Sequence, residues 1–223
     1  MSRAGLATGR AAAALAVLLA VTILAGCGAP RFSYATDSSA HAYFKVPFGW
    51  EKITDSDLIT QLSGGQSSSL PAGVWTAGYD ASASPAAADL LNPQASRPFA
   101  YALVEPVNAT TTDSLSYNTL RDFFLPVTST ARQTAAKSGF QLTGFKQLRN
   151  TVITPGQGVH GVRVTYDYTY PDGSTDTFDQ VALMNSEATE VYVLMVHCLA
   201  ACYQQYQGKI NTVMTSFTVR NPR

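Results

Sequence analysis

The sequence has few charges, and this shortage excludes some classes of partner. Charged residues make up 13% of the 223 residues, 15 basic against 15 acidic, with no basic patch or stripe. Nucleic acids and anionic lipid surfaces are bound through clustered lysine and arginine. The sequence alone therefore argues against a nucleic-acid partner and against electrostatic binding to anionic lipid.

The sequence also lacks the motifs of well-known catalytic sites. It contains no G-x-S-x-G, no H-E-x-x-H, no G-x-G-x-x-G after a strand and no phosphate loop. Its three histidines, His41, His160 and His197, stand apart, and Asp172 and Asp176 flank a hairpin turn where we expect them to be solvated. We expect a protein that is not an enzyme and holds no cofactor or metal. The alternative is an envelope hydrolase of unrecognised type, which a pocket grouping His160 or His197 with a carboxylate and a hydroxyl would support.

No apolar run is long enough to span a membrane. The uncharged run Ala11–Leu24 has 14 residues, whereas a spanning helix needs about 20. It follows Arg3 and Arg10 with no acid between them, an arrangement typical of an export signal. Its end, Leu24-Ala25-Gly26-Cys27, resembles the lipobox of bacterial lipoproteins. We predict that residues 1–26 are a signal peptide, that Cys27 carries lipid, and that the protein is anchored to the extracytoplasmic face of the cell membrane. The alternative is an ordinary secreted protein with an incidental cysteine.

The segment behind Cys27 has little apolar content. Residues 28–40 read GAPRFSYATDSSA, and such a segment buries too little surface to offset its ordering entropy. We predict a flexible tether at residues 27–40 and a single domain at residues 41–223. Removing the signal lowers Lys plus Arg from 15 to 13 against 15 acids, so the mature charge is −2. We expect a monomer.

Only three cysteines are present. If Cys27 carries lipid, Cys198 and Cys202 are the remaining thiols, and an exported compartment favours their pairing. A metal site needs four ligands at fixed spacing, and in a strand His197 and Cys198 point to opposite faces. We expect a local disulfide, with free thiols and a metal or redox site as the alternatives.

Strand and helix patterns fill the rest of the chain. Strands are predicted within residues 41–54 and at Val74–Ala81, Arg97–Val107, Phe140–Arg149, Gly158–Tyr170, Thr177–Met184 and Glu190–His197. Helices are predicted after Thr54, after Ser116, at Thr128–Lys137 and at Cys202–Phe217. The apolar strand Glu190–His197 is predicted to be central and buried on both faces. The sum is an α+β fold, a mostly antiparallel sheet of about six or seven strands flanked by helices.

Several short segments carry a family resemblance. They are Phe44–Trp50 (FKVPFGW), Phe178–Val181 (FDQV), Val191–Leu194 (VYVL) and Ser216–Val219 (SFTV). With the order of elements, they resemble the PsbP/Mog-like α/β/α sandwich and, within it, actinobacterial lipoproteins of the LpqN/LpqT kind. The resemblance implies a non-enzymatic accessory or binding protein of the envelope. Trp50 is interpreted as a core anchor, with ligand stacking as the alternative.

Tyrosines supply the candidate binding residues. Tyr166, Tyr168 and Tyr170 alternate along one face of a predicted strand, and Tyr192 on a later strand can join them. Tyrosine combines a rigid apolar ring with a polar tip, which suits recognition. One hypothesis is that this face receives a protein partner or a lipidic ligand. The other is that it forms the sheet core.

Overall fold

The computed structural model describes residues 31–220 and 222. The predicted signal peptide at residues 1–26 and the predicted lipidation site Cys27 lie outside the described residues. Residues Phe32–Arg223 form one compact unit. No helix in the described part of the chain is long and apolar enough to cross a membrane.

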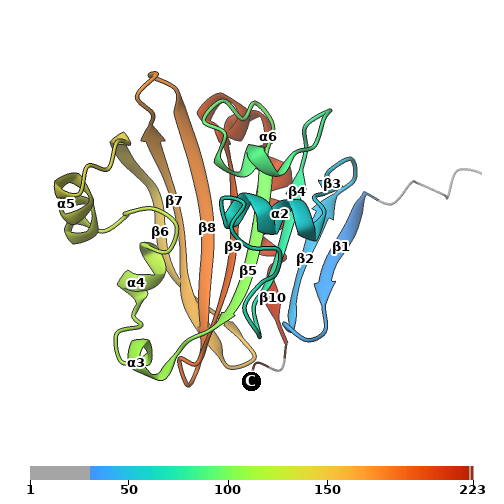
Figure 1. The fold of residues 1–223 in the computed structure, drawn as a ribbon, viewed down its shortest axis with the longest axis vertical. Helices are drawn as coiled ribbons and strands as arrows, with labels where there is room; N and C mark the ends of the chain where they lie inside the picture. The colour runs from blue at the N-terminus through green and yellow to red at the C-terminus, as the bar shows by residue number, and fades with distance from the viewer. Residues whose placement is uncertain (1–30, 221, 223) are drawn as a thin grey trace, which may run out of the picture. The chain divides into compact units, whose positions relative to one another are not determined.

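A seven-stranded antiparallel sheet forms the centre of this unit (Figure 1). Its strands, in spatial order, are β3 (Glu51–Lys52), β4 (Trp75–Asp80), β5 (Phe99–Pro106), β9 (Glu190–Leu199), β8 (Thr175–Asn185), β7 (Val159–Thr169) and β6 (Thr143–Gly156). The predicted α+β class and strand number are confirmed. Strand β9 is central and buried along nearly its whole length, as its apolar sequence predicts.

Strand β6 differs from its prediction. It begins at Thr143 rather than Phe140 and runs on to Gly156. Its pairing with β7 shifts register at three places, beginning next to Gly144, whose φ is +60°. Such bulges disturb the side-chain alternation from which strand limits are predicted.

A second, three-stranded sheet was not predicted. Its order is β1 (Phe32–Asp37), β2 (Ala42–Pro47) and β10 (Thr218–Val219). The predicted tether at residues 27–40 is therefore wrong for Phe32–Asp37, and the domain begins before residue 41. An edge strand of this kind buries side chains on one face only, and in β1 the buried side chain is that of Ala35. The turn into β2 is closed by the Asp37 carboxylate, which accepts hydrogen bonds from the backbone N–H groups of Ser39 and Ala40, both at 2.8 Å.

Three of the helices begin where capping side chains predict. The helices are α2 (Asp55–Leu62), α3 (Ala109–Thr112), α4 (Tyr117–Arg121), α5 (Ser129–Lys137) and α6 (Ala200–Thr215), with the 3-10 helix η2 at Ala87–Leu91. Thr54, Ser116 and Thr128 each accept a hydrogen bond from a backbone N–H of the first turn through the side-chain oxygen. Helix α4, predicted after Ser116, is short and stops at Arg121, five residues before Pro126.

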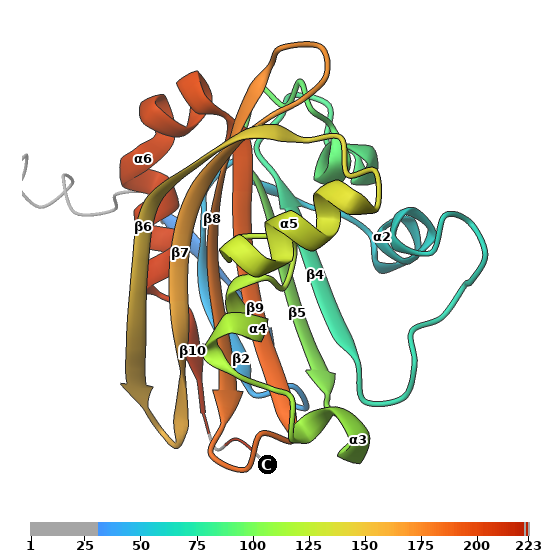
Figure 2. The same ribbon diagram turned by 90° about the vertical axis from the view of Figure 1, so that its left-hand side faces the viewer.

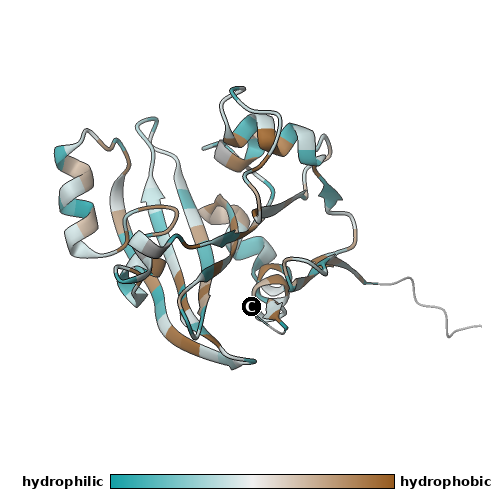
Figure 3. Cartoon of the chain, turned by 60° about the horizontal axis from the view of Figure 1, so that its bottom comes forward, coloured by the Kyte–Doolittle hydropathy of each residue, from teal (hydrophilic) through white to brown (hydrophobic). Residues whose placement is uncertain are grey.

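The two faces of the seven-stranded sheet are covered differently (Figure 2). One face, here called the α6 face, lies under α6 and the three-stranded sheet and carries Ala77, Val104, Leu183, Tyr192 and Leu194. The other, here called the aromatic face, lies under the η2 and α2 to α5 segments and carries Phe99, Tyr101, Tyr166, Tyr168 and Phe178. Helix α5 has no buried residue, and Figure 3 shows little hydrophobic colour on it. The layer over this end of the aromatic face is therefore thinly attached.

Candidate functional site

The predicted tyrosine row lies in the core. Tyr166 is 0% exposed and Tyr168 is 2% exposed, whereas Tyr170 is half-buried beyond the end of β7. The Tyr168 hydroxyl donates a 2.5 Å hydrogen bond to the Pro126 carbonyl, and burial raises its pKa to about 12. Phe145 packs against both buried rings, at 6.1 and 5.4 Å between centroids. Burial contradicts the recognition-surface hypothesis for Tyr166 and Tyr168 and favours the core hypothesis.

Tyr192 does not join this row. Its strand partner is Leu183, on the α6 face, and the ring is fully buried there. The prediction that Tyr192 shares a face with Tyr166 is wrong. Which side chains of β9 and β7 share a face is set by how each strand is paired with β8, and this register is not visible in the sequence. The Tyr192 hydroxyl donates a short hydrogen bond to the carboxylate of Glu190, a residue of the pocket described below.

The cysteine pair forms the expected disulfide. Cys198, at the end of β9, is bonded to Cys202 in the first turn of α6, with the two Cα atoms 5.9 Å apart. Both are buried, and Ala95 packs beside them. The bond joins the central strand to the helix over the α6 face, so its role here is structural.

His197, one of the two histidines named in the hydrolase alternative, has no access to solvent. His197 Nδ1 lies 3.2 Å from Asp176 Oδ2, and both side chains are fully buried. The prediction that Asp176 is solvated is wrong, because the hairpin points it into the aromatic face beside the imidazole. Burial raises the pKa of the Asp176 carboxyl, and the hydrogen bond to His197 opposes that effect. A substrate cannot reach this pair without the covering layer opening, so the pair does not favour the hydrolase alternative.

Aromatic rings surround that histidine. His197 stacks on Phe178 at 5.4 Å between centroids, and Phe178 stacks on Tyr166 at 5.5 Å. Phe99 lies on the other side of His197 at 6.3 Å. These four residues are direct cross-strand neighbours on β7, β8, β9 and β5. His197 is thus a core residue, as its position in an apolar strand predicts.

A pocket at one end of the two sheets is the better candidate. Its volume is about 350 Å³, and four segments meet around it: the β1–β2 turn, the entrance of β4, the end of β5 and the β8–β9 turn. Its lining residues are Ser39, Ala40, Gly73, Val74, Trp75, Pro106, Thr189 and Glu190. Ligand pockets of small molecules have volumes of roughly 300–1,000 Å³. This pocket lies at the lower end of that range.

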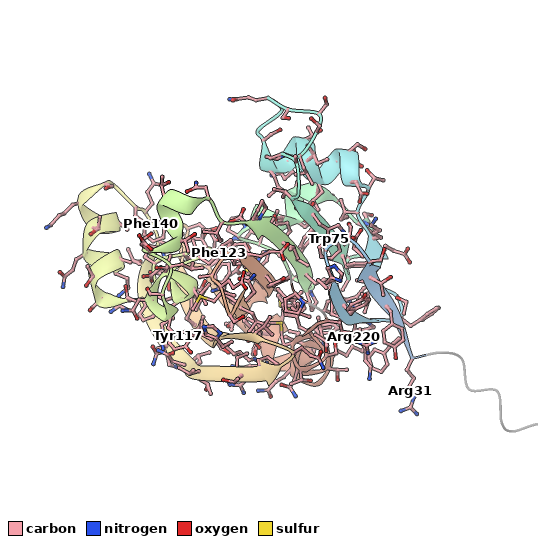
Figure 4. All side chains as sticks on the ribbon, turned by 90° about the horizontal axis from the view of Figure 1, so that it is seen from below. Arg31, Trp75, Tyr117, Phe123, Phe140 and Arg220 are labelled. Carbon is pink, nitrogen blue, oxygen red and sulfur yellow. A yellow bond between two sulfur atoms is a disulfide. The ribbon has the colours of Figure 1, made fainter. Side chains whose placement is uncertain are left out.

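Trp75 forms one wall of the pocket. It is the first residue of β4, pairs with Val104, and is partly buried against the core of the α6 face. Figure 4 views the unit from this end and shows Trp75 on the side of β1 and β2, away from Tyr117, Phe123 and Phe140. The chain enters β4 through Gly73, whose φ of +82° suits glycine. Trp50, by contrast, is buried in the core, as its interpretation as an anchor predicts.

Glu190 supplies the charge of the pocket. It is the first residue of β9 and pairs with Pro106, which also lines the pocket. The preceding turn is held by Asn185, whose side-chain carbonyl accepts hydrogen bonds from the backbone N–H of Thr189 at 2.8 Å and of Glu190 at 3.2 Å. With the hydroxyl of Tyr192 on its carboxylate, Glu190 is fixed from both backbone and side chain.

The electrostatics of the pocket are one-sided. Glu190 is the only charged residue in the lining. The three ion pairs among residues 31–220 and 222 join Lys52 to Asp55, Arg163 to Asp179 and His197 to Asp176. Glu190 takes part in none of them. An aromatic wall beside a carboxylate without a cation can accept a positively charged group through cation–π attraction and an ion pair.

Sequence reasoning missed both main residues of this pocket. Trp75 and Glu190 are far apart in sequence and meet only because β9 inserts next to β5. The available signals were weak: a tryptophan two residues after Pro71-Ala72-Gly73, and a single acid at the start of an apolar strand. Among the described residues, no group of three or more His, Cys, Asp or Glu side chains is arranged to hold a metal ion.

The fold is known from other proteins, although the sequence matches no protein-family model and no curated protein. Cyanobacterial PsbP (CyanoP) from Synechocystis sp. is 14% identical, with a TM-score of 0.51 over 87% of this chain and 95% of that chain. The Ran-binding protein Mog1p of Saccharomyces cerevisiae is 10% identical, with a TM-score of 0.44 over 86% of this chain and 96% of that one. LpqN of Mycobacterium tuberculosis, which is involved in cell envelope biogenesis, is 14% identical, with a TM-score of 0.43 over 86% and 87%. At these identities the similarity concerns the fold alone, and the chain has the PsbP-like α+β fold.

Proposed function

We propose that this protein is a lipid-anchored binding protein on the extracytoplasmic face of a bacterial cell membrane, of the LpqN/LpqT kind and without catalytic activity. The anchoring rests on the export signal and on Leu24–Cys27. The disulfide between Cys198 and Cys202 suits a compartment outside the cytoplasm, where disulfides persist.

The observation that carries the binding role is the Trp75–Glu190 pocket. Its carboxylate is held in place by Tyr192, forms no ion pair among the described residues, and shares the pocket lining with a partly exposed tryptophan. Glu190 contributes hydrogen-bond acceptors and no donor when ionised. A ligand that presents an ammonium group matches both features, because an ammonium donates hydrogen bonds and is attracted to an indole face.

A titration with small amines tests this proposal. Residues 28–223 contain the whole compact unit, so this chain serves as the sample. The indole N–H signal of Trp75 in NMR is followed while n-butylammonium chloride, or uncharged n-butanol, is added. We expect the ammonium ion to shift this signal in a saturable way, and Glu190→Gln to weaken its binding about tenfold or more, since charge-assisted hydrogen bonds are roughly twice as strong as neutral ones.

The matched control is Glu187→Gln. Glu187 is exposed on the same β8–β9 turn but does not line the pocket, so its substitution removes the same charge without touching the site. Equal binding of butanol and butylammonium, or equal weakening by both substitutions, would contradict the ammonium assignment. Melting temperatures of the variants show whether each is folded.

A further inference from the structure

The outward face of the three-stranded sheet carries a group of aromatic and basic side chains. In β2, Phe44 and Val46 point into the core, whereas Tyr43 and Lys45 alternate to the outside. Tyr34 of β1 is the direct partner of Lys45 and is 65% exposed. This face shares no residue with the Trp75–Glu190 pocket.

The C-terminal end of the chain adds a second cation to this face. Thr218 of β10 pairs with Tyr43, and the Arg220 guanidinium lies 5.3 Å from the centre of the Tyr43 ring. Figure 4 shows Arg220 beside the N-terminal strands. These side chains border a hollow of about 460 Å³, lined by Tyr34, Tyr43, Phe44, Lys45, Ser216, Thr218 and Arg220.

The charge of this hollow is positive and uncompensated. None of its lining residues is acidic. Neither Lys45 nor Arg220 belongs to any of the three ion pairs in the described part of the chain. The Ser216 hydroxyl is already used, since it accepts from the Lys45 backbone N–H at 2.8 Å and donates to the Val213 carbonyl at 2.7 Å. The two cations and the tyrosine hydroxyls are thus the groups left to meet an outside partner.

An exposed phenylalanine lies near the start of β1. Phe48, in the turn Pro47–Trp50, is 75% exposed, the most exposed large apolar side chain of those described. Pro47, next to it, pairs with Phe32, the first residue of β1. The chain therefore enters the domain beside Phe48.

The position of β1 sets how far the domain can lie from its anchor. Cys27 precedes Phe32 by five residues, and five fully extended residues span at most about 18 Å. The predicted tether to residue 40 would have allowed more than twice that distance. Because β1 uses Phe32–Asp37 for the small sheet, a lipid on Cys27 keeps the entrance of β1 close to the headgroups.

We propose that Tyr34, Tyr43, Lys45, Phe48 and Arg220 dock the domain on the headgroups of an anionic bilayer. The inference rests on the proposed anchoring for its geometry. Tyrosines are enriched at the membrane–water interface, and lysine and arginine near the surface each contribute about 1 kcal/mol of attraction to anionic lipids. The sequence hides this surface because residues 43–48 and residue 220 meet only in the fold.

The first experiment does not depend on lipidation. Residues 28–223 are sedimented with vesicles of phosphatidylglycerol and phosphatidylcholine, or of phosphatidylcholine alone. We expect binding to the anionic vesicles only, weakened by salt, and about 30-fold weaker for the double variant Lys45→Gln/Arg220→Gln. The control is Lys137→Gln/Lys146→Gln, which removes two exposed charges from α5 and β6 and should bind like the unchanged chain.

Two outcomes would overturn the proposal. One is equal binding by both double variants. The other is full competition by millimolar inorganic phosphate, which would show a site for free phosphate instead of a bilayer surface.

The second experiment examines the anchored protein. The lipidated chain with Phe48→Cys carries a nitroxide at that position and is reconstituted in anionic vesicles, with Leu148→Cys on exposed β6 as the control. We expect the label at 48 to collide with membrane-dissolved oxygen and the label at 148 to collide with a water-soluble nickel chelate. Equal exposure of both labels to the chelate would overturn the proposal. Mass spectrometry of the N-terminal peptide reports lipidation separately, so a failed anchor is distinguished from a failed docking surface.

Discussion

The two faces of the seven-stranded sheet bury polar side chains in different ways. On the α6 face, Arg163 and Asp179 form a bidentate pair, with Nε–Oδ1 at 3.0 Å and Nη2–Oδ2 at 2.7 Å. On the aromatic face, four fully buried side chains each have an atom without a hydrogen-bond partner among the described residues. The atoms are Tyr166 Oη, Asp176 Oδ1, Gln180 Oε1 and His197 Nε2.

The covering layers differ in the same sense. Helix α6 is bonded to the sheet through the disulfide and through Tyr203, whose hydroxyl donates to Asp179 at 2.8 Å. Asn211 of the same helix accepts from Arg163 at 3.2 Å. Helix α5 buries no residue at all. The α6 face is thus tied to its covering layer by a disulfide and by hydrogen bonds to a buried ion pair. The aromatic face is covered mainly through ring packing, with Tyr168 and Gln180 donating hydrogen bonds to backbone carbonyls of the layer above it.

Removing Asp179 tests the α6 face and should have the largest effect. Asp179→Ala leaves Arg163 buried without its partner, and breaking a buried ion pair costs about 3–5 kcal/mol. Urea unfolding of the variant and of the parent chain measures the difference. Asp167→Ala, on the neighbouring strand, removes only an acceptor from Thr177 and should cost about 0.5–1.5 kcal/mol. Both carboxylates lie on the α6 face, so similar losses for the two variants would mean that the ion pair stabilises this face no more than a single hydrogen bond does.

Removing the disulfide should have an intermediate effect. Cys198→Ala/Cys202→Ala opens a loop of only five residues, for which chain entropy gives about 2 kcal/mol of stabilisation. Thermal and urea unfolding measure the loss, and hydrogen exchange locates it. Exchange should rise in α6 more than in α5. An increase spread evenly over both faces would mean that the bond does not act through the α6 face.

Neutralising Asp176 should have the smallest effect on the free energy of unfolding. The variant should become more stable relative to the parent chain as the pH is raised. Burial raises the pKa of this carboxyl, so the folded state binds its proton more tightly than the unfolded state does. The stability that this proton supplies is present below the unfolded pKa and is lost as pH rises through the window up to the folded pKa. Asp176→Asn has no such loss. Its stability relative to the parent should therefore increase as pH is raised from about 4, near the ordinary Asp pKa. Urea unfolding at several pH values measures this, and a difference that falls with pH would contradict it.

Local patterns predicted much of the fold. The alternation in β7, the caps Thr54, Ser116 and Thr128, and the apolar run of β9 each depend on residues close in sequence. The disulfide was predictable on other grounds, because Cys198 and Cys202 are the thiols that remain if Cys27 carries lipid, and an exported compartment favours their pairing. The α+β class follows from these elements together.

The remaining features depend on pairing between distant segments. Strand β1 is too polar to be predicted from its own residues and forms through its pairing with β2. The face on which Tyr192 lies depends on the register of β7 with β8 and of β8 with β9. The Trp75–Glu190 pocket requires β9 to lie beside β5, a pairing that joins Phe99 to His197. No periodicity within a short window contains that information.

The position of β9 has a consequence for how the chain acquires its structure. Within the described large sheet, this strand joins β3–β4–β5 to β8–β7–β6, yet it is the last of the seven strands in sequence. Pairings between such distant segments form slowly, because a long loop must close first. An exported chain, as proposed above, that entered the channel from its N-terminus could not complete the large sheet until β9, residues 190–199, had emerged. Late arrival of this one strand would keep the polypeptide translocation-competent without requiring any separate device.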